Sequence, residues 1–96
     1  MCQIFAGQDP ETYQPETRRM RLNGHSTSIR LERSFWSIID EIAASEGITT
    51  PAFISTLHAE VIELHGGAAN FTSLLRCACL IHKGQLPVGG QTIAAE

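Results

Sequence analysis

The chain has 96 residues, enough for one domain with a modest hydrophobic core. Hydrophobic residues make up 43% of it, an ordinary share for a globular protein, and no apolar run reaches the roughly 18 residues that a membrane span requires. The three cysteines are odd in number, and the N-terminus lacks the basic segment of a signal peptide. We therefore expect a cytoplasmic protein with no disulfide framework and no membrane partner.

The charge of the chain is unevenly distributed. The formal net charge is −3, yet five of the seven Lys and Arg residues lie between positions 18 and 33. Only Glu32 opposes them there, so this segment carries +4 (five basic, one acidic) and the remainder −7 (two basic, nine acidic). A basic segment on an acidic body can orient the protein toward the phosphates of a nucleic acid. Alternatively, the segment is a solvated arginine arm that pairs with acidic residues of a neighbouring subunit.

The first part of the chain predicts a leader and a β-hairpin. Residues 1–17 form the leader, in which Ile4 and Phe5 could add a short strand or a packing hook. Polar and apolar residues then alternate on both sides of Asn23-Gly24. This is a strong hairpin signal, because a type I′ turn needs positive φ at both central residues. We expect positions 18–22 to pair with a second strand at 26–31.

The second strand should have two different faces, because successive side chains of a strand point to opposite sides. The mostly apolar face, expected to contact the core, consists of Thr27, Ile29 and Leu31. The outward face consists of Ser26, Ser28 and Arg30. The hairpin would occupy one edge of this strand and leave the other edge for the strand of a second copy.

Three helices should follow the hairpin. The first runs from about position 32 to 46 and ends at Gly47, which adopts the left-handed conformation readily. The second begins with Thr49 or Thr50 as N-cap, with Pro51 in its first turn, and ends at Gly66. A third helix spans about 71–83, with Asn70 expected as its cap, and a disordered tail follows from position 85.

Apolar residues at helical spacing predict the core-facing side of each helix, and Trp36 lies beside the first of these stripes. The stripes are Phe35, Ile38, Ile39, Ile42 and Ala43 in the first helix, Phe53, Ile54, Leu57, Val61 and Leu64 in the second, and Phe71, Leu74, Leu75, Ala78 and Ile81 in the third. The predicted organisation is a leader (1–17), a strand-helix-helix domain with its hairpin arm (18–65), a C-terminal helix packed on that domain (66–84) and a tail (85–96). A strand and two helices bury too little apolar surface alone, which predicts a homodimer or a higher homo-oligomer.

No set of residues has the spacing of a metal or catalytic site. His58 and His65 would lie about 10 Å apart along a helix, and Cys77 and Cys79 would point roughly 200° apart around one. A thiol-imidazole pair of Cys79 with His82 is better explained by packing on an apolar helix. We expect no metal, no cofactor and no enzymatic activity.

The arrangement resembles the ribbon-helix-helix family of MetJ- and Arc-type repressors. The resemblance covers residues 26–64 and rests on Ser28-Ile29-Arg30-Leu31, on the first two helical stripes and on Gly47-Ile48-Thr49-Thr50. A broader likeness, over positions 2–82, is to a group of short bacterial members of that family. It rests on Cys2 to Phe5, Thr17 to Gly24, Thr27 to Trp36 and Asn70-Phe71.

The resemblance implies a mainly α fold with a short β ribbon, namely a ribbon-helix-helix dimer with an N-terminal hairpin arm and an extra C-terminal helix. It also implies a sequence-specific DNA-binding transcriptional regulator whose ribbon enters the major groove of double-stranded DNA. By position, the base-reading residues would be Ser26, Ser28 and Arg30. The phosphate contacts would come from Arg18, Arg19, Arg21, Thr49 and Thr50.

The same fold could instead be an oligomerisation or protein-interaction module that binds a protein partner and no DNA. The acidic body favours this alternative, and Pro51 removes one N–H donor from the start of the second helix. Two paired hairpins would also form a four-stranded sheet, which fits poorly into a groove about 12 Å wide when strands lie about 4.8 Å apart. For DNA binding, the arm at 18–22 would have to swing away and grip phosphate.

Overall fold

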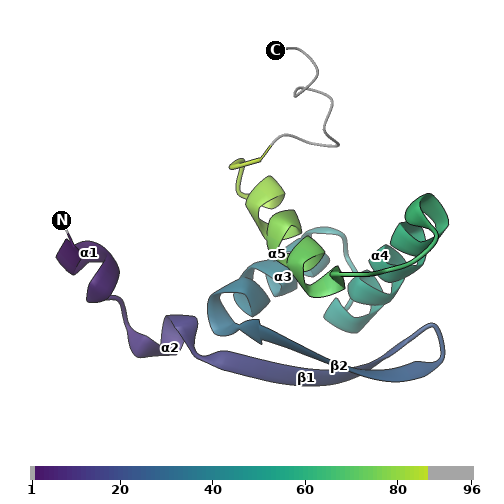
Figure 1. The fold of residues 1–96 in the computed structure, drawn as a ribbon, viewed down its shortest axis with the longest axis horizontal. Coiled ribbons are helices and arrows are strands. Elements are labelled where there is room, and N and C mark those ends of the chain that lie inside the picture. The colour runs from purple at the N-terminus through teal and green to yellow at the C-terminus, as the bar shows by residue number, and fades with distance from the viewer. Residues whose placement is uncertain (1, 87–96) are drawn as a thin grey trace, which may run out of the picture.

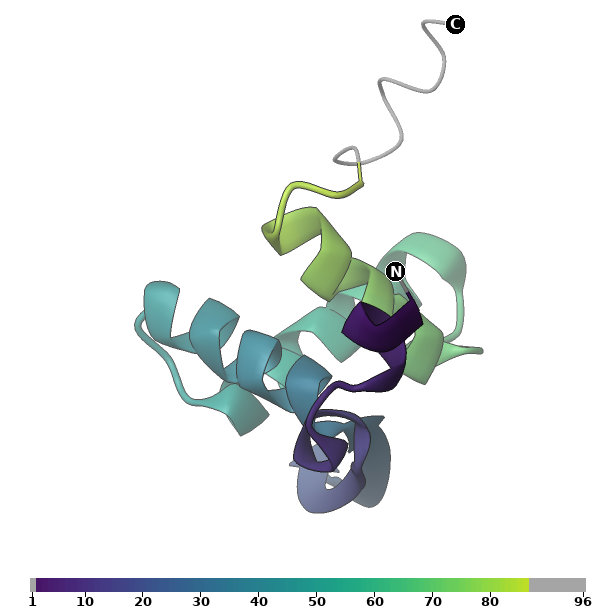
Figure 2. The same ribbon diagram turned by 90° about the vertical axis from the view of Figure 1, so that its left-hand side faces the viewer.

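The computed structural model describes residues 2–86 and has a β-hairpin on one side and three helices on the other (Figure 1). In chain order the elements are α1 (Cys2–Ala6), α2 (Pro10–Tyr13), β1 (Pro15–Leu22), β2 (His25–Glu32), α3 (Arg33–Ser45), α4 (Thr50–His65) and α5 (Phe71–His82). Both views show the hairpin along the lower side with α3, α4 and α5 above it (Figures 1 and 2). Most of the tail predicted at 85–96 lies outside the described residues.

The hairpin forms as predicted. β1 and β2 pair antiparallel, with Pro15 opposite Glu32 and Leu22 opposite His25. Asn23 and Gly24 have φ of 54° and 88°, the positive values that a tight two-residue turn needs. β1 begins at Pro15, inside the predicted leader, because the antiparallel pairing continues to the end of β2.

The core lies between the inner face of the hairpin and the helices. Its buried cluster consists of Met20, Leu22, Ile29, Leu31, Trp36, Ile39, Ile54, Leu75 and Cys79. Trp36, which lies beside the apolar stripe of α3 in the sequence pattern, is part of this core, with 1% of its surface exposed. Its indole N–H donates to the carbonyl oxygen of Glu16 at 2.8 Å, so the one polar atom of the ring is satisfied.

Most helix ends follow the predicted signals. Gly47 and Gly66 have φ of 74° and 79°, the left-handed conformation in which helices commonly end. The Thr49 hydroxyl accepts a hydrogen bond from Ala52 N at 3.2 Å and caps α4, with Pro51 in the first turn. Asn70 stands at the start of α5 but makes no capping hydrogen bond, because its own backbone is left-handed (φ 59°). None of the described helices is long and apolar enough to span a membrane.

Three predictions about packing are wrong. The leader forms the helices α1 and α2, not a strand, and α1 is no packing hook within the chain, since Ile4 and Phe5 are 76% and 68% exposed. Leu64 was expected in the core but is 78% exposed, because the last turn of α4 extends past the hairpin and α3 (Figure 1). Ile81, in the last turn of α5, is also exposed.

Candidate functional site

One face of the hairpin points away from all the helices and is lined by polar side chains. We call it the outer face, and it consists of Thr17, Arg19, Arg21, Ser26, Ser28 and Arg30, all exposed. The strand register puts Thr17 opposite Arg30, Arg19 opposite Ser28 and Arg21 opposite Ser26. Directly opposite residues of an antiparallel pair have their Cβ atoms about 4.5–5.5 Å apart. Residues from both strands are therefore close neighbours on this face.

The outer face holds the cations that have no acidic partner among the residues the structure describes. Four of the seven Lys and Arg side chains form ion pairs: Arg18 with Asp40 at 2.8 Å, Arg33 with Glu11 at 2.9 Å, Arg76 with Glu32 at 3.1 Å and Lys83 with Glu41 at 3.0 Å. The other three, Arg19, Arg21 and Arg30, form no ion pair with any residue in the described range 2–86. Arg21 donates to the carbonyl oxygen of Gly24 at 3.0 Å, which holds it at the turn.

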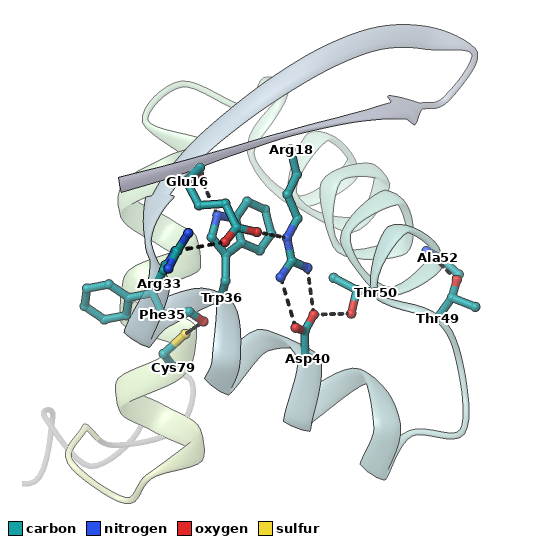
Figure 3. Close-up of polar contacts among 10 residues, drawn as sticks. All are labelled: Glu16, Arg18, Arg33, Phe35, Trp36, Asp40, Thr49, Thr50, Ala52 and Cys79. Carbon is teal, nitrogen blue, oxygen red and sulfur yellow. Dashed lines mark hydrogen bonds and ion pairs between the residues drawn. The ribbon is translucent and has the colours of Figure 1, made fainter. Parts of the chain in front are cut away.

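Arg18 lies on the opposite side of the sheet, against the helices (Figure 3). Its Nη1 and Nη2 donate to the two carboxylate oxygens of Asp40 at 2.8 and 3.1 Å, and its Nε donates to Glu16 at 2.8 Å. Its guanidinium carbon lies 4.3 Å from the centre of the Trp36 ring. Arg18 is therefore not brought together with Arg19 and Arg21, and it fastens to α3 the arm that would have to swing away if it were to grip phosphate.

Asp40 joins this network to the start of α4. The Thr50 hydroxyl donates to its Oδ1 at 2.7 Å (Figure 3). The hydrogen bond from Arg18 lowers the pKa of Asp40 below its ordinary value, and the same contact raises the pKa of Arg18. The sequence analysis did not identify this role of Asp40. The only available signal was its position one helical turn after Trp36, which does not identify Arg18 as the partner.

The hydroxyls of the two threonines predicted to contact phosphate are engaged within the chain. Thr49 accepts from Ala52 N, and Thr50 donates to Asp40. Their contacts put the start of α4 beside the Arg18–Asp40 pair, on the helix side of the hairpin and not on the outer face. Pro51 contributes no N–H to this helix start.

Neither the buried thiol of Cys79 nor the cavity between α2 and α3 offers a comparable site. Cys79 is fully buried, its thiol donates to the carbonyl oxygen of Phe35 at 3.7 Å, and burial raises its pKa to about 11. Such a thiol is a poor nucleophile at neutral pH. A shallow cavity of about 400 Å³ between α2 and α3 contains Arg33, whose charge is already paired with Glu11. Residues 2–86 contain no cluster of three or more metal-ligating side chains.

Similarity to known proteins extends over most of the chain. A model of the ribbon-helix-helix domain matches residues 15–83, from the first residue of β1 to just beyond α5. An uncharacterized protein from Bordetella pertussis Tohama I has a similar solved structure, with a TM-score of 0.80 and 38% sequence identity over 95% of this chain and 77% of that chain. No curated protein sequence matches this one.

Proposed function

The chain belongs to the ribbon-helix-helix domain family, and from this premise we propose that it is a sequence-specific DNA-binding transcriptional regulator that acts as a dimer. One observation carries the proposal. All three arginines that have no ion-pair partner within residues 2–86 lie on the outer face of the hairpin. Unpaired cations on one exposed surface attract the phosphates of double-stranded DNA, and arginine side chains can also bond to base edges in its major groove.

The proposed contacts come from the outer face of the hairpin and from the start of α4. Ser26, Ser28 and Arg30 face the base edges, and Arg30 is the strongest reader because its fork can donate two hydrogen bonds to guanine O6 and N7. The start of α4, at Thr49 and Thr50, lies near a backbone phosphate, where the positive end of the helix dipole favours an anion.

Exposed apolar side chains support the proposed dimer. Leu64 is 78% exposed and Ile62 40% exposed on α4, and Ile48 lies exposed just before that helix. Apolar side chains of this size gain free energy when a second subunit covers them. The second edge of β2 also has no strand beside it in the described part of the chain, so it is open to pairing.

A selection from random and genomic DNA duplexes at low and moderate salt tests the proposal. The wild type should enrich a defined site, and Arg30→Ala should weaken binding to that site by about 1–3 kcal/mol. Lys83→Ala is the matched control, because it removes the same charge from an ion-paired residue at the C-cap of α5. Equal affinity of Arg30→Ala and wild type for the enriched site would contradict the assignment.

The second candidate function is an oligomerisation or protein-interaction module without DNA. The exposed Ile4 and Phe5 of α1 favour it, since this short helix projects beyond the hairpin with its apolar side chains in solvent (Figure 1). An absence of DNA binding at either salt concentration, together with an assembly larger than a dimer that buries the outer face, would favour this candidate.

A further inference from the structure

We propose that α1 is an exchanged arm that packs on the last two turns of α4 in a second copy of the chain. The inference rests on the dimer of the proposed function and names the surfaces that cover each other there. The apolar side chains of the arm, Ile4 and Phe5, are exposed. The apolar side chains of its seat, Ile62 and Leu64, are exposed as well. Removing both surfaces from water is favourable.

The base of the arm is fastened to the domain, whereas the arm itself is not. α2 is held at the start of α3, where Arg33 pairs with Glu11 at 2.9 Å. The Ser34 hydroxyl also donates to the carbonyl oxygen of Thr12 at 2.6 Å. The described hydrogen bonds of α1 reach no farther than Gln8. α1 therefore projects beyond the end of the hairpin where β1 begins, on the helix side of the sheet (Figures 1 and 2).

The arm cannot reach this seat within its own chain. The Asn23 amide nitrogen, in the hairpin turn, lies 3.1 Å from Nδ1 of His58, so the last two turns of α4 lie at the turn end of the hairpin. α1 lies at the other end of the eight-residue strands, about 26 Å away at the rise of a β-strand. Only residues 7–9 separate α1 from α2, and a segment of this length spans about 10 Å at most.

Antiparallel pairing of β2 with β2 of a second copy brings the arm and the seat together. The two strands run in opposite directions, so Glu32 at the end of one lies toward His25 at the start of the other. Glu32 is opposite Pro15 in its own hairpin. The leader end of each copy therefore lies beside the turn end of the other. Two-fold symmetry repeats the contact at both ends of the four-stranded sheet.

The charges of the two surfaces are compatible with this contact. The last two turns of α4 contain the acidic residues Glu60 and Glu63. Residues 2–8 contain no charged side chain. The arm therefore brings no like charge to the acidic helix and buries no unpaired ion when it covers the apolar side chains.

Isotope-filtered NMR on a dimer mixed from labelled and unlabelled chains tests the contact directly. Nuclear Overhauser effects should connect the Phe5 ring of one copy to the Leu64 methyl groups of the other. Effects between Phe5 and Leu64 of the same chain, or between Phe5 and side chains of α5, would overturn the inference. So would a dimer in which Phe5 shows no intermolecular effect.

Sedimentation equilibrium of variants tests the same contact energetically. Phe5→Ala and Leu64→Ala should each raise the Kd of the dimer about tenfold. The double variant should raise it little further, because each change removes the same contact. Both side chains are exposed in the single chain, so the variants should fold. Tyr13→Ala is the matched control, since Tyr13 is an exposed aromatic residue of α2, outside the arm, and should leave the Kd unchanged.

The possible results separate this inference from the proposed function. If the wild type is a dimer that enriches a DNA site and Phe5→Ala dimerises equally well, the inference fails and the function stands. A dimer that shows the contact between Phe5 and Leu64 but binds no DNA would support the inference and remove the function. An assembly larger than a dimer that Phe5→Ala reduces to a dimer would place the arm on a third copy and overturn the inference. A wild type that stays monomeric and binds no DNA would overturn both.

Discussion

At the scale of single residues, Arg18 and Arg19 illustrate how one step along a strand changes the role of a side chain. Arg19 points to solvent on the outer face, whereas Arg18 points to α3 and binds Asp40 through two hydrogen bonds. The alternation of a strand accounts for the difference, because neighbouring residues face opposite sides. Three arginines within four positions are therefore not one basic cluster.

The Arg18–Asp40 pair predicts a pH dependence of stability. The pKa of Asp40 is lowered from its ordinary value of 3.8, chiefly by the hydrogen bond from Arg18, so its contribution is complete above that value and is lost as the pH falls through the lowered pKa. Asp40→Asn should reduce the free energy of unfolding by about 1 kcal/mol at pH 7, discounted for partial exposure. The difference from wild type should shrink below about pH 4.

Urea unfolding at several pH values measures this difference. Glu41→Gln is the control, because the Glu41 carboxylate pairs with Lys83 at an exposed position and its loss should change stability little. The role assigned to Asp40 would be wrong if Asp40→Asn and wild type were equally stable at pH 7.

At the scale of elements, the hairpin depends on the backbone conformation of its turn. Gly24 has φ of 88° and open space where a Cβ would lie, so Gly24→Ala meets strain and no clash. We expect it to lower the free energy of unfolding by about 1–2 kcal/mol, the cost of a left-handed conformation for a residue with a Cβ. Gly67→Ala is the matched control, since Gly67 has similar open space and no positive φ and should be close to neutral. Equal melting temperatures of the two variants would contradict this reading of the turn.

The elements that could be predicted from the sequence are those with local signals. Asn23-Gly24 specified the hairpin, and Gly47, Thr49 and Gly66 marked helix ends that the structure confirms. Long-range packing carried no such signal. Trp36 is buried in the core, and its indole N–H donates to the Glu16 carbonyl of β1, twenty residues earlier in the chain. No local pattern around Trp36 indicates this partner.

The candidate site was predictable only in part, for the same reason. The alternation of β2 indicated that Ser26, Ser28 and Arg30 share a face, and the structure places them on one. That Arg19 and Arg21 lie opposite Ser28 and Ser26 required the strand register, and that Arg18 pairs with Asp40 required the position of Asp40 on α3. The DNA contacts assigned to these residues remain predictions.

At the scale of the whole molecule, the charges are sorted between two sides. The helix side contains ion pairs that neutralise Arg18, Arg33, Arg76 and Lys83, while the outer face keeps three arginines without acidic partners in the described range. A chain with a net charge of −3 can therefore present a locally cationic ribbon to a polyanion. The acidic body would repel DNA in other orientations, which favours approach by the hairpin.

The most direct test of this account is to map the DNA contact surface on the folded protein. Amide and arginine side-chain NMR signals of the labelled wild type would be followed during titration with the enriched duplex. We expect the largest shifts at Thr17, Arg19, Arg21, Ser26, Ser28 and Arg30, smaller shifts at the start of α4, and little change along α5. Shifts concentrated on α5 or α1, with the outer face unaffected, would contradict the central claim that the hairpin is the interface.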